Sequence, residues 1–374
     1  MDTPAGTAAF EVDSSEQRGF WPLLRQSVSA HGLFFALIAA YYAGFLMLLH
    51  LRPDVQPGNF LMMALGFTAF SLPVMFIGLL FTRFYHIARF VQPERPIPAL
   101  AADLRQYLSD RGRLAHGLPM VLVMVLFMYV FVQVKSAIPV LNPFGWDETF
   151  VQWDGLLHFG YQPWELLQPV FGYAPVTFLI NLNYNAWFAV MWVVWVYFAF
   201  ADRANADRTR FFLTFFLSWV IGGGVMAVYF SSVGPCFYGR LGHAPDIFAG
   251  QMDYLRAVNE VLPIWAIQMQ DLLWASFHGN ATIEGISAMP SMHNATALLF
   301  ALAGFRIGRT AGWLLSVHAI LIFIGSVHLA WHYAVDSYVA WVVTLVLWLA
   351  MAPVSRWWHG TDAQRNFAAA LTRV

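Results

Sequence analysis

The sequence predicts an all-α integral membrane protein with about eight transmembrane helices, and three observations support this prediction. Hydrophobic residues make up 59% of the 374 residues and charged residues only 11%, whereas soluble domains carry about 25% charged residues. Apolar runs of nearly bilayer-spanning length recur along the chain, and basic residues gather in alternate loops between them. This composition excludes an ordinary cytosolic protein and a disordered chain. The net charge of −1 excludes a nucleic-acid-binding protein.

Eight apolar runs are candidates for crossing the membrane, which takes about 20 predominantly apolar residues. In chain order, the predicted spans are Leu33–Leu51, Phe60–Phe81, Leu118–Val134, Pro175–Phe200, Phe211–Phe230, Ala295–Phe305, Trp313–Trp331 and Tyr338–Met351. The sixth run is too short to span alone, because Arg306 follows it directly.

The basic residues orient these spans. With the N-terminus in the cytoplasm, sixteen of the 20 lysines and arginines lie in cytoplasmic segments, and the others are Arg52, Lys135, Arg240 and Arg256. Because basic residues favour the cytoplasmic side of a membrane, both termini are expected there. Lys135, the only lysine, follows the third span and is interpreted as an anchor at the membrane interface.

The spans divide the chain into four expected parts. Residues 1–32 form a cytoplasmic tail, 33–116 hold two spans and a basic loop, 117–353 hold six spans, and 354–374 form a second cytoplasmic tail. The first 32 residues lack the basic start and the cleavage site of a signal peptide. The single cysteine, Cys236, excludes an intrachain disulfide and a CxxC metal or redox site.

Two long segments, residues 135–174 and 231–290, fall on the extracytoplasmic side. Each contains an amphipathic stretch, Trp146–Leu157 and Tyr254–Phe277, which is expected to lie flat at the interface. Extensive loops on one face commonly carry function, so this face is expected to hold the working site. Alternatively, these segments only seal the helix bundle. Trp153, Asp154 and His158 lie in the first segment, and the sequence assigns them no role.

One candidate site consists of His332 and Asp336. On a helix, residues four apart share a face, so the carboxylate can accept the Nδ1–H of the imidazole and leave Nε2 free. A nucleophilic or general-base histidine needs this arrangement. The alternative is a satisfied polar pair inside the bundle, but ionisable groups at membrane depth are costly and usually functional.

A second candidate site surrounds His293. Pro290 and Ser291 before an apolar run predict a helix start with Ser291 as N-cap. Because this helix is short, its N-terminus should open below the membrane surface as an anion site. Together the two sites suit transfer of a phosphoryl group from a lipid. His332 attacks phosphorus, His293 protonates the leaving oxygen, and water or an alcohol accepts the group. This chemistry needs no cofactor or metal.

These residues resemble the motifs of the type-2 phosphatidic acid phosphatase superfamily of membrane phosphatases and phosphotransferases. Its three motifs are K-x6-RP, PSGH and SR-x5-H-x3-D. The second is similar to Pro290-Ser291-Met292-His293, and the third to Gly325-Ser326 followed by His332 and Asp336. The resemblance implies a six-helix catalytic core after two extra helices. It implies His332 as nucleophile, His293 as acid and base, and Asp336 as the orienting residue.

The departures from these motifs concern the cations that grip phosphate. Met292 replaces the PSGH glycine and Ser326 the arginine, while Gly234 and Ala227 stand at the arginine and lysine positions of the first motif. A phosphodiester carries one negative charge and tolerates this loss better than a dianionic monoester. The departures resemble the inositol phosphorylceramide and sphingomyelin synthases, so a phosphotransferase is favoured over a phosphatase of phosphatidic acid or polyprenyl phosphate.

The expected partners are a phospholipid donor and a lipid alcohol acceptor, or water, in a membrane, without nucleic acid or an obligate protein partner. The active site is expected to face the periplasm, exterior or lumen. The candidate substrate-binding residues are Ser291, Tyr238, Arg240 and His328. Arg240 is the candidate for the missing positive charge, and its alternative is a solvated loop arginine.

Two other classes of function remain open. The positions of His328, His332 and Asp336, four residues apart, form one helical stripe that suits a metal ion. A polar patch at Asn181 and residues 183–185 suits either a transport path or contacts between helices.

Overall fold

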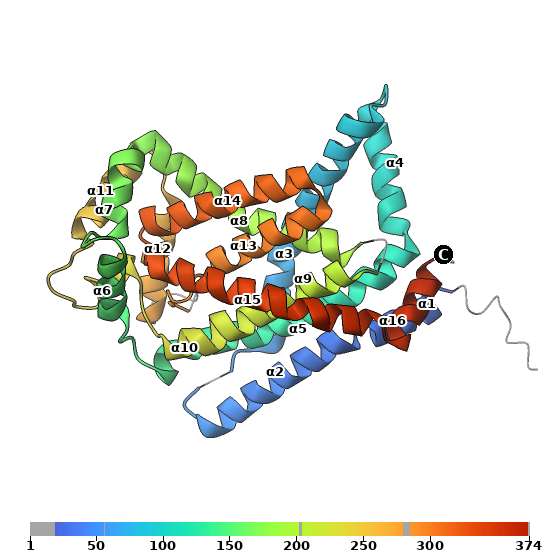
Figure 1. Ribbon diagram of the computed structural model, residues 1–374, viewed down its shortest axis with the longest axis horizontal. Helices are drawn as coiled ribbons and strands as arrows, with labels where there is room; N and C mark the ends of the chain where they lie inside the picture. The colour runs from blue at the N-terminus through green and yellow to red at the C-terminus, as the bar shows by residue number, and fades with distance from the viewer. Residues whose placement is uncertain (1–18, 56, 202–203, 280–284, 373–374) are drawn as a thin grey trace, which may run out of the picture.

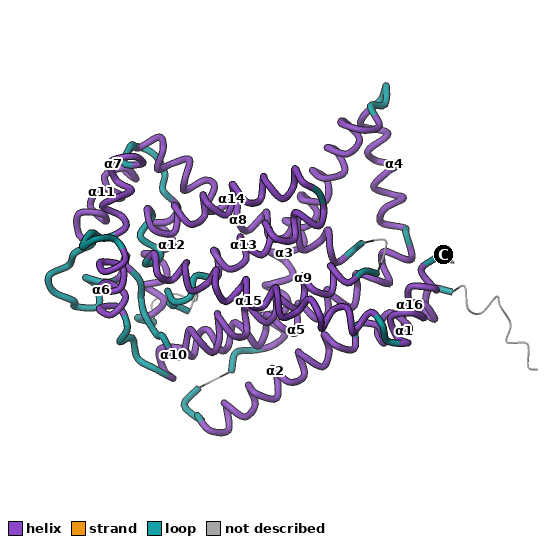
Figure 2. The backbone as a smooth tube through the Cα atoms, in the orientation of Figure 1, coloured by secondary structure: helices purple, strands orange, loops and turns teal. Residues whose placement is uncertain are grey.

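A computed structural model describes residues 19–55, 57–201, 204–279 and 285–372. Within these ranges the protein consists of helices and loops, and no strand is assigned (Figure 2). The long helices run roughly along the longest axis of the molecule (Figure 1). This architecture confirms the predicted all-α integral membrane protein.

Seven helical segments of the described chain are long and apolar enough to cross a membrane. They are α2 (Gly32–Leu51), α3 (Phe60–His86) with a π-helical end (Ile87–Val91), α5 (Arg111–Leu141), α8 (Ala174–Ala199), α9 (Ala206–Leu217) continued through a π-helical stretch (Ser218–Met226) into α10 (Ala227–Tyr229), α14 (Arg309–His328) and α15 (Ala334–His359). The runs predicted to span are all found as helices, although the sixth differs from the others.

That sixth run is α13 (Met292–Ile307), which has 16 residues. Its length is about 24 Å at 1.5 Å per residue, less than the ~30 Å of a bilayer core. Several of its residues are buried, because it packs against α9, α14 and α15. The shortness predicted from Arg306 is therefore found, and α13 begins inside the bundle.

Four short helices gather at one end of the molecule, at the left in Figure 1. They are α6 (Asp147–Leu157), α7 (Pro163–Phe171), α11 (Ala249–Val261) and α12 (Trp265–Phe277). The first predicted amphipathic stretch matches α6. The second is divided into α11 and α12 around Pro263, which cannot donate a backbone hydrogen bond.

The opposite end carries the helices α1 (Phe20–Ala30), α4 (Pro96–Ser109) and α16 (Asp362–Leu371) (Figure 1). Both expected tails thus contain a helix, and α1 packs against α16. The Gln364 side chain donates to the carbonyl of Ala30 over 2.6 Å, and Phe367 is fully buried beside them. Residues 1–18 of the predicted tail lie outside the described ranges.

Glycines in the π-helical stretch Ser218–Met226 bring the backbone close to the start of α13. A Cβ atom at Gly223 would lie 2.9 Å from the ring of Phe131 and 3.3 Å from the side chain of Met292. A larger residue would displace the Phe131 ring. π-helical segments often occur at functional sites, and this one borders the cavity described next.

Candidate active site

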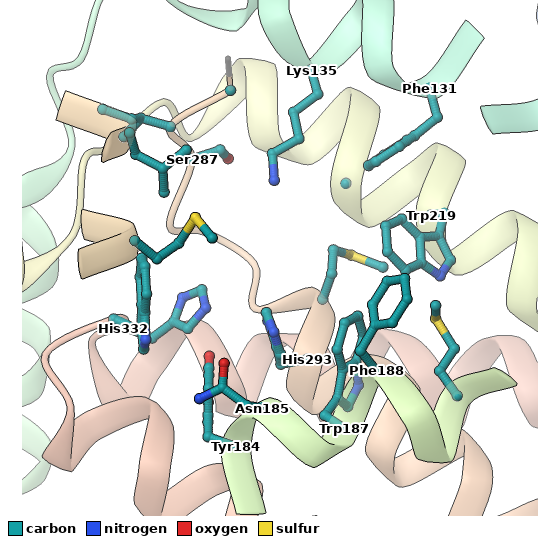
Figure 3. Close-up of a pocket in the computed structure, with 18 of the residues that line it drawn as sticks. Phe131, Lys135, Tyr184, Asn185, Trp187, Phe188, Trp219, Ser287, His293 and His332 are labelled. Carbon is teal, nitrogen blue, oxygen red and sulfur yellow. The ribbon is translucent and has the colours of Figure 1, made fainter. Parts of the chain in front are cut away.

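A cavity of about 680 Å³ lies where α3, α5, α8, the π-helical stretch Ser218–Met226, α12, α13 and three loops meet. Most of its wall is aromatic or aliphatic. Apart from tryptophans, the described polar side chains in the wall are Lys135, Tyr184, Asn185, Ser287, His293 and His332 (Figure 3). The cavity thus brings together the two histidines that the sequence placed in separate candidate sites.

His332 is held by Asp336, as the spacing predicted, but not as two residues of one helix. His332 precedes α15, and Asp336 lies in its first turn. The imidazole Nδ1 donates to Asp336 Oδ2 over 3.2 Å, and the same oxygen accepts the Tyr333 N–H over 3.1 Å. Burial lowers the pKa of His332, although a hydrogen bond with the backbone of Ala288 opposes this shift, so the ring is neutral. With the proton on Nδ1, which faces Asp336, Nε2 keeps a free lone pair. This geometry fits a nucleophile.

His293 stands in the first turn of α13, and its ring centroid lies 6.4 Å from that of His332. Two aromatic rings of α8 flank it, Tyr184 at 4.6 Å and Trp187 at 4.1 Å between centroids. The Trp187 indole N–H donates to Thr296 on α13 over 2.8 Å, which fixes that ring. The imidazole of His293 is therefore oriented by packing.

Ser291 is the N-cap of α13, which confirms the prediction from the sequence. Its hydroxyl accepts from the Asn294 side chain over 3.0 Å, and its N–H donates to the carbonyl of Asp336 over 3.2 Å. The backbone therefore ties the two motif segments directly to each other. The described cavity wall does not include Ser291.

The segment around Gly234 explains one departure from the motifs. Gly234 has a φ of +88°, and a Cβ atom there would lie 2.8 Å from the carbonyl oxygen of Trp331. The N–H of Cys236 donates to the carbonyl of Ala330 over 2.9 Å, so this segment packs against the loop that carries His332. No arginine side chain fits at position 234.

Lys135 is the functional candidate that the sequence interpretation missed. It lines the cavity from α5, on the side opposite His293 and His332 (Figure 3). Its side chain passes close to Gly285, where a Cβ atom would lie 2.9 Å from its Cγ. Within the described ranges, no acceptor or carboxylate pairs with its ammonium group. The interpretation as an interfacial anchor is thus corrected. The signal in the sequence for a functional role was that Lys135 is the single lysine of the chain.

Comparison with known families identifies the superfamily of the chain. A family model described as the PAP2 superfamily matches residues 148–350, more than half of the 374 residues. The chain belongs to the PAP2 superfamily. It is therefore a phosphatase or phosphotransferase type of enzyme, with chemistry on lipid phosphates. No curated protein and no solved structure matches the chain.

Like Ser291, the other three predicted substrate-binding residues of this PAP2 enzyme lie outside the described cavity wall. Arg240 forms an ion pair with Asp271 on α12. Tyr238 stacks on His243, with ring centroids 4.4 Å apart. His328 shares a hydrogen bond with the Thr177 hydroxyl over 2.9 Å. The side chains of Arg240 and His328 thus have polar partners elsewhere, and the Tyr238 ring packs on another ring. Proximity in sequence to the motifs did not reveal these contacts.

The metal-binding alternative expected one helical stripe of His328, His332 and Asp336. The stripe is not present, because α14 ends at His328 and α15 begins only at Ala334. The described part of this PAP2 enzyme contains no group of three or more His, Cys, Asp and Glu residues placed to hold a metal ion.

The polar patch of α8 divides between two roles in this PAP2 enzyme. Asn183 shares a hydrogen bond with His318 on α14 over 3.0 Å, and Asn181 accepts from the N–H of Ala266 on α12 over 3.2 Å. These two contacts join elements, as the structural alternative predicted. Tyr184 and Asn185 instead line the cavity.

Proposed function

We propose that this PAP2 superfamily enzyme is a lipid phosphotransferase. It moves a phospho-headgroup from a phosphodiester lipid to a lipid alcohol through a phosphohistidine. The observation that carries this proposal is the charge of the cavity. Among the described residues of its wall, Lys135 is the single lysine or arginine, and none is a carboxylate. One positive charge matches the single negative charge of a diester better than a dianionic monoester.

In the first half-reaction, Nε2 of His332 attacks phosphorus and forms an N–P bond. The P–O bond to the glycerolipid oxygen breaks. His293, which binds a proton together with the anionic donor, gives that proton to the oxygen. Asp336 accepts the Nδ1–H of His332 and stabilises the positive charge that develops on the ring. Lys135 stabilises the negative oxygens on phosphorus.

In the second half-reaction, the hydroxyl of the acceptor lipid attacks the phosphohistidine. His293 takes the hydroxyl proton, an O–P bond forms, and the N–P bond breaks to restore His332. The apolar and aromatic wall favours a lipid alcohol over water as acceptor, because it disfavours water near the phosphohistidine. This reaction class is that of the inositol phosphorylceramide and sphingomyelin synthases.

The proposal includes the orientation and the division of the chain. The short helices α6, α7, α11 and α12 and the cavity lie on the periplasmic, exterior or lumenal side, and both termini are cytoplasmic. Residues 117–353 form the catalytic unit, and residues 33–116 add two spans to it. The distribution of basic residues supports this arrangement.

The test is turnover by purified protein in lipid micelles. Phosphatidylinositol or another glycerophospholipid, labelled in the headgroup phosphate, is supplied with or without ceramide or diacylglycerol, in parallel with phosphatidic acid. We expect label transfer that depends on the acceptor and disappears in His332→Ala. His278→Ala, at an exposed histidine outside the cavity wall, is the matched control.

Two results would contradict the proposal in different ways. Phosphate release from phosphatidic acid without transfer to an acceptor would identify a phosphatase that uses the same histidines. Equal activity of His332→Ala and His278→Ala on every substrate would remove His332 from the chemistry.

A further inference from the structure

The helix α6 carries two buried acids, Asp147 and Asp154, which are 0% and 1% exposed. They stand seven residues apart, close to two helical turns, and therefore lie on the same face of α6. Glu148, the residue after Asp147, is exposed. Burying a carboxylate is unfavourable unless hydrogen bonds compensate it, so the partners of these two acids indicate what they hold.

Asp154 holds the start of α15. Its Oδ2 accepts the N–H of Ala334 over 2.7 Å, and its Oδ1 accepts the N–H of Val335 over 2.9 Å. These N–H groups belong to the first turn of α15, where the helix offers no internal acceptor and a carboxylate is favourable. The bonded residues follow His332 by two and three positions.

Asp147 joins the two loops that meet beside His332. It accepts the N–H groups of Val233 and Gly234 over 3.1 and 3.0 Å, and the hydroxyl of Tyr333 over 2.8 Å. Tyr333 is the residue directly after His332. Asp147 and Asp154 thus fix both the segment at Gly234 and the backbone that leads from His332 into α15.

The unfavourable free energy of burying these two acids indicates that α6 does more than seal the bundle. Burial raises the pKa of Asp154 to about 7, although the N–H groups of Ala334 and Val335 oppose this shift. An amphipathic helix can cover the bundle with apolar residues alone. Catalysis, in contrast, depends on placement, since a misplacement of about 1 Å can reduce a rate about 100-fold.

We propose that α6 acts as a two-point clamp on the nucleophile loop, which is the loop of residues 329–333 between α14 and α15 that carries His332. Asp154 and Asp147 are positioning residues that fix the backbone after His332 and so set the direction of its imidazole toward the substrate phosphorus. Neither acid belongs to the described cavity wall. This proposal rests on the proposed role of His332 as nucleophile, but not on the identity of the acceptor.

The test is rapid-quench measurement of phosphohistidine formation, with a diester lipid that the wild-type protein turns over, labelled in its headgroup phosphate. The amplitude of phosphohistidine formation measures the fraction of competent sites. Its rate constant measures how well His332 is aligned with the substrate phosphorus. In Asp154→Asn, an amide N–H₂ replaces one acceptor oxygen. We expect the rate constant to fall by up to about 100-fold, the loss that a misplacement of about 1 Å can cause, with little change in amplitude.

Glu148→Gln is the matched control, because it removes an exposed carboxylate from the same helix. Tyr333→Phe is a milder second variant. It deletes only the hydroxyl bound to Asp147 and keeps the ring contacts with Phe150 and Phe248. We expect its rate constant to fall about fivefold, the effect of one ordinary hydrogen bond.

The outcomes separate the clamp from the proposed function. If Asp154→Asn and Tyr333→Phe both match Glu148→Gln in rate constant while His332→Ala forms no phosphohistidine, the clamp is wrong and the proposed function stands. A lower amplitude with an unchanged rate constant indicates a purely structural role, which also overturns the clamp. If Asp154→Asn does not fold, Tyr333→Phe decides alone. If the wild-type protein forms no phosphohistidine, the nucleophile assignment and the clamp both fall.

Discussion

At the scale of single residues, Lys135 sets the charge of the cavity. Lys135→Met removes that charge and keeps a side chain of similar length. We expect kcat/KM for a diester donor to fall about 10- to 100-fold, because hydrogen bonds to charged groups contribute about 1.5–3 kcal/mol. Lys135→Arg should retain most of the activity. The measurement is initial rate against donor concentration in mixed micelles.

Arg240→Met is the matched control for Lys135→Met. It removes a positive charge that is paired with Asp271 outside the described cavity wall. Its kcat/KM should stay close to that of the wild-type protein. If the two variants lose activity equally, the charge that matters is not in the cavity, and the argument for a diester donor loses its support.

Asp336 holds the tautomer of His332, so Asp336→Asn should be far more damaging than its small change in shape suggests. An amide can donate to Nδ1 and select the wrong tautomer, and in a serine protease triad this substitution lowers kcat about 10⁴-fold. We expect a loss of kcat of the same order. Asp271→Asn, at an exposed aspartate, is the control. A loss of less than about tenfold, far below the triad value, would mean that Asp336 does not orient the nucleophile.

The residues of the site differ in how far the sequence predicts them. His293, His332 and Asp336 stand in motifs with fixed spacing, and the structure brings all three together. Lys135 is remote from these motifs and reaches the cavity because α5 packs against α8 and the π-helical stretch Ser218–Met226, which also line it. Arg240 lies near the first motif in sequence, but its side chain turns to Asp271. The spacing of residues in the sequence predicts which neighbouring residues become partners. The direction in which a side chain points can be found only from the packed structure.

At the scale of elements, α3 contributes to the cavity although it precedes the part of the chain that matches the PAP2 superfamily. Phe67, Phe70 and Val74 of α3 line the cavity, where Phe67 and Phe70 contact the α8 rings Trp192 and Phe188. An acyl chain of a lipid substrate is expected to lie against this wall. Val74→Trp should therefore shift the preference toward donors with shorter chains.

Competition between labelled donors of two chain lengths measures this shift. We expect the ratio of kcat/KM for the longer over the shorter donor to fall about tenfold, the effect of excluding about two methylene groups at 0.8 kcal/mol each. Ile77→Trp, on an exposed part of α3 outside the described wall, is the control. An unchanged ratio in Val74→Trp would place the acyl chain elsewhere.

The helices themselves follow closely from the apolar runs, and the errors have local causes. The second amphipathic stretch is divided at Pro263, which hydropathy does not register. The metal-binding stripe assumed that one helix continues through residues 328–336, but the chain leaves α14 at His328. Counting residues along an assumed helix fails where a loop interrupts it, although the His332–Asp336 pair survives because Asp336 caps the next helix.

At the scale of the whole molecule, the two ends differ in kind. The end with α6, α7, α11 and α12 lies beside the segments that carry His293 and His332. The other end carries α1, α16 and the C-terminus (Figure 1). Sixteen of the 20 basic residues fall in the segments predicted to be cytoplasmic. The orientation follows from that charge distribution, whereas the fold alone, without a membrane, fits either direction.

Cysteine labelling tests the orientation directly, because the native chain offers little background. Its only cysteine, Cys236, is buried, and burial raises the pKa of the thiol, which suppresses the reactive thiolate. Glu94→Cys places a thiol in the loop before α4, and Glu260→Cys places one near the end of α11. Both positions are exposed. With a membrane-impermeant maleimide on intact cells, we expect labelling of Glu260→Cys at once and of Glu94→Cys only after permeabilisation. The reverse pattern would place the cavity on the cytoplasmic side, and its lipid substrates would then come from the inner leaflet.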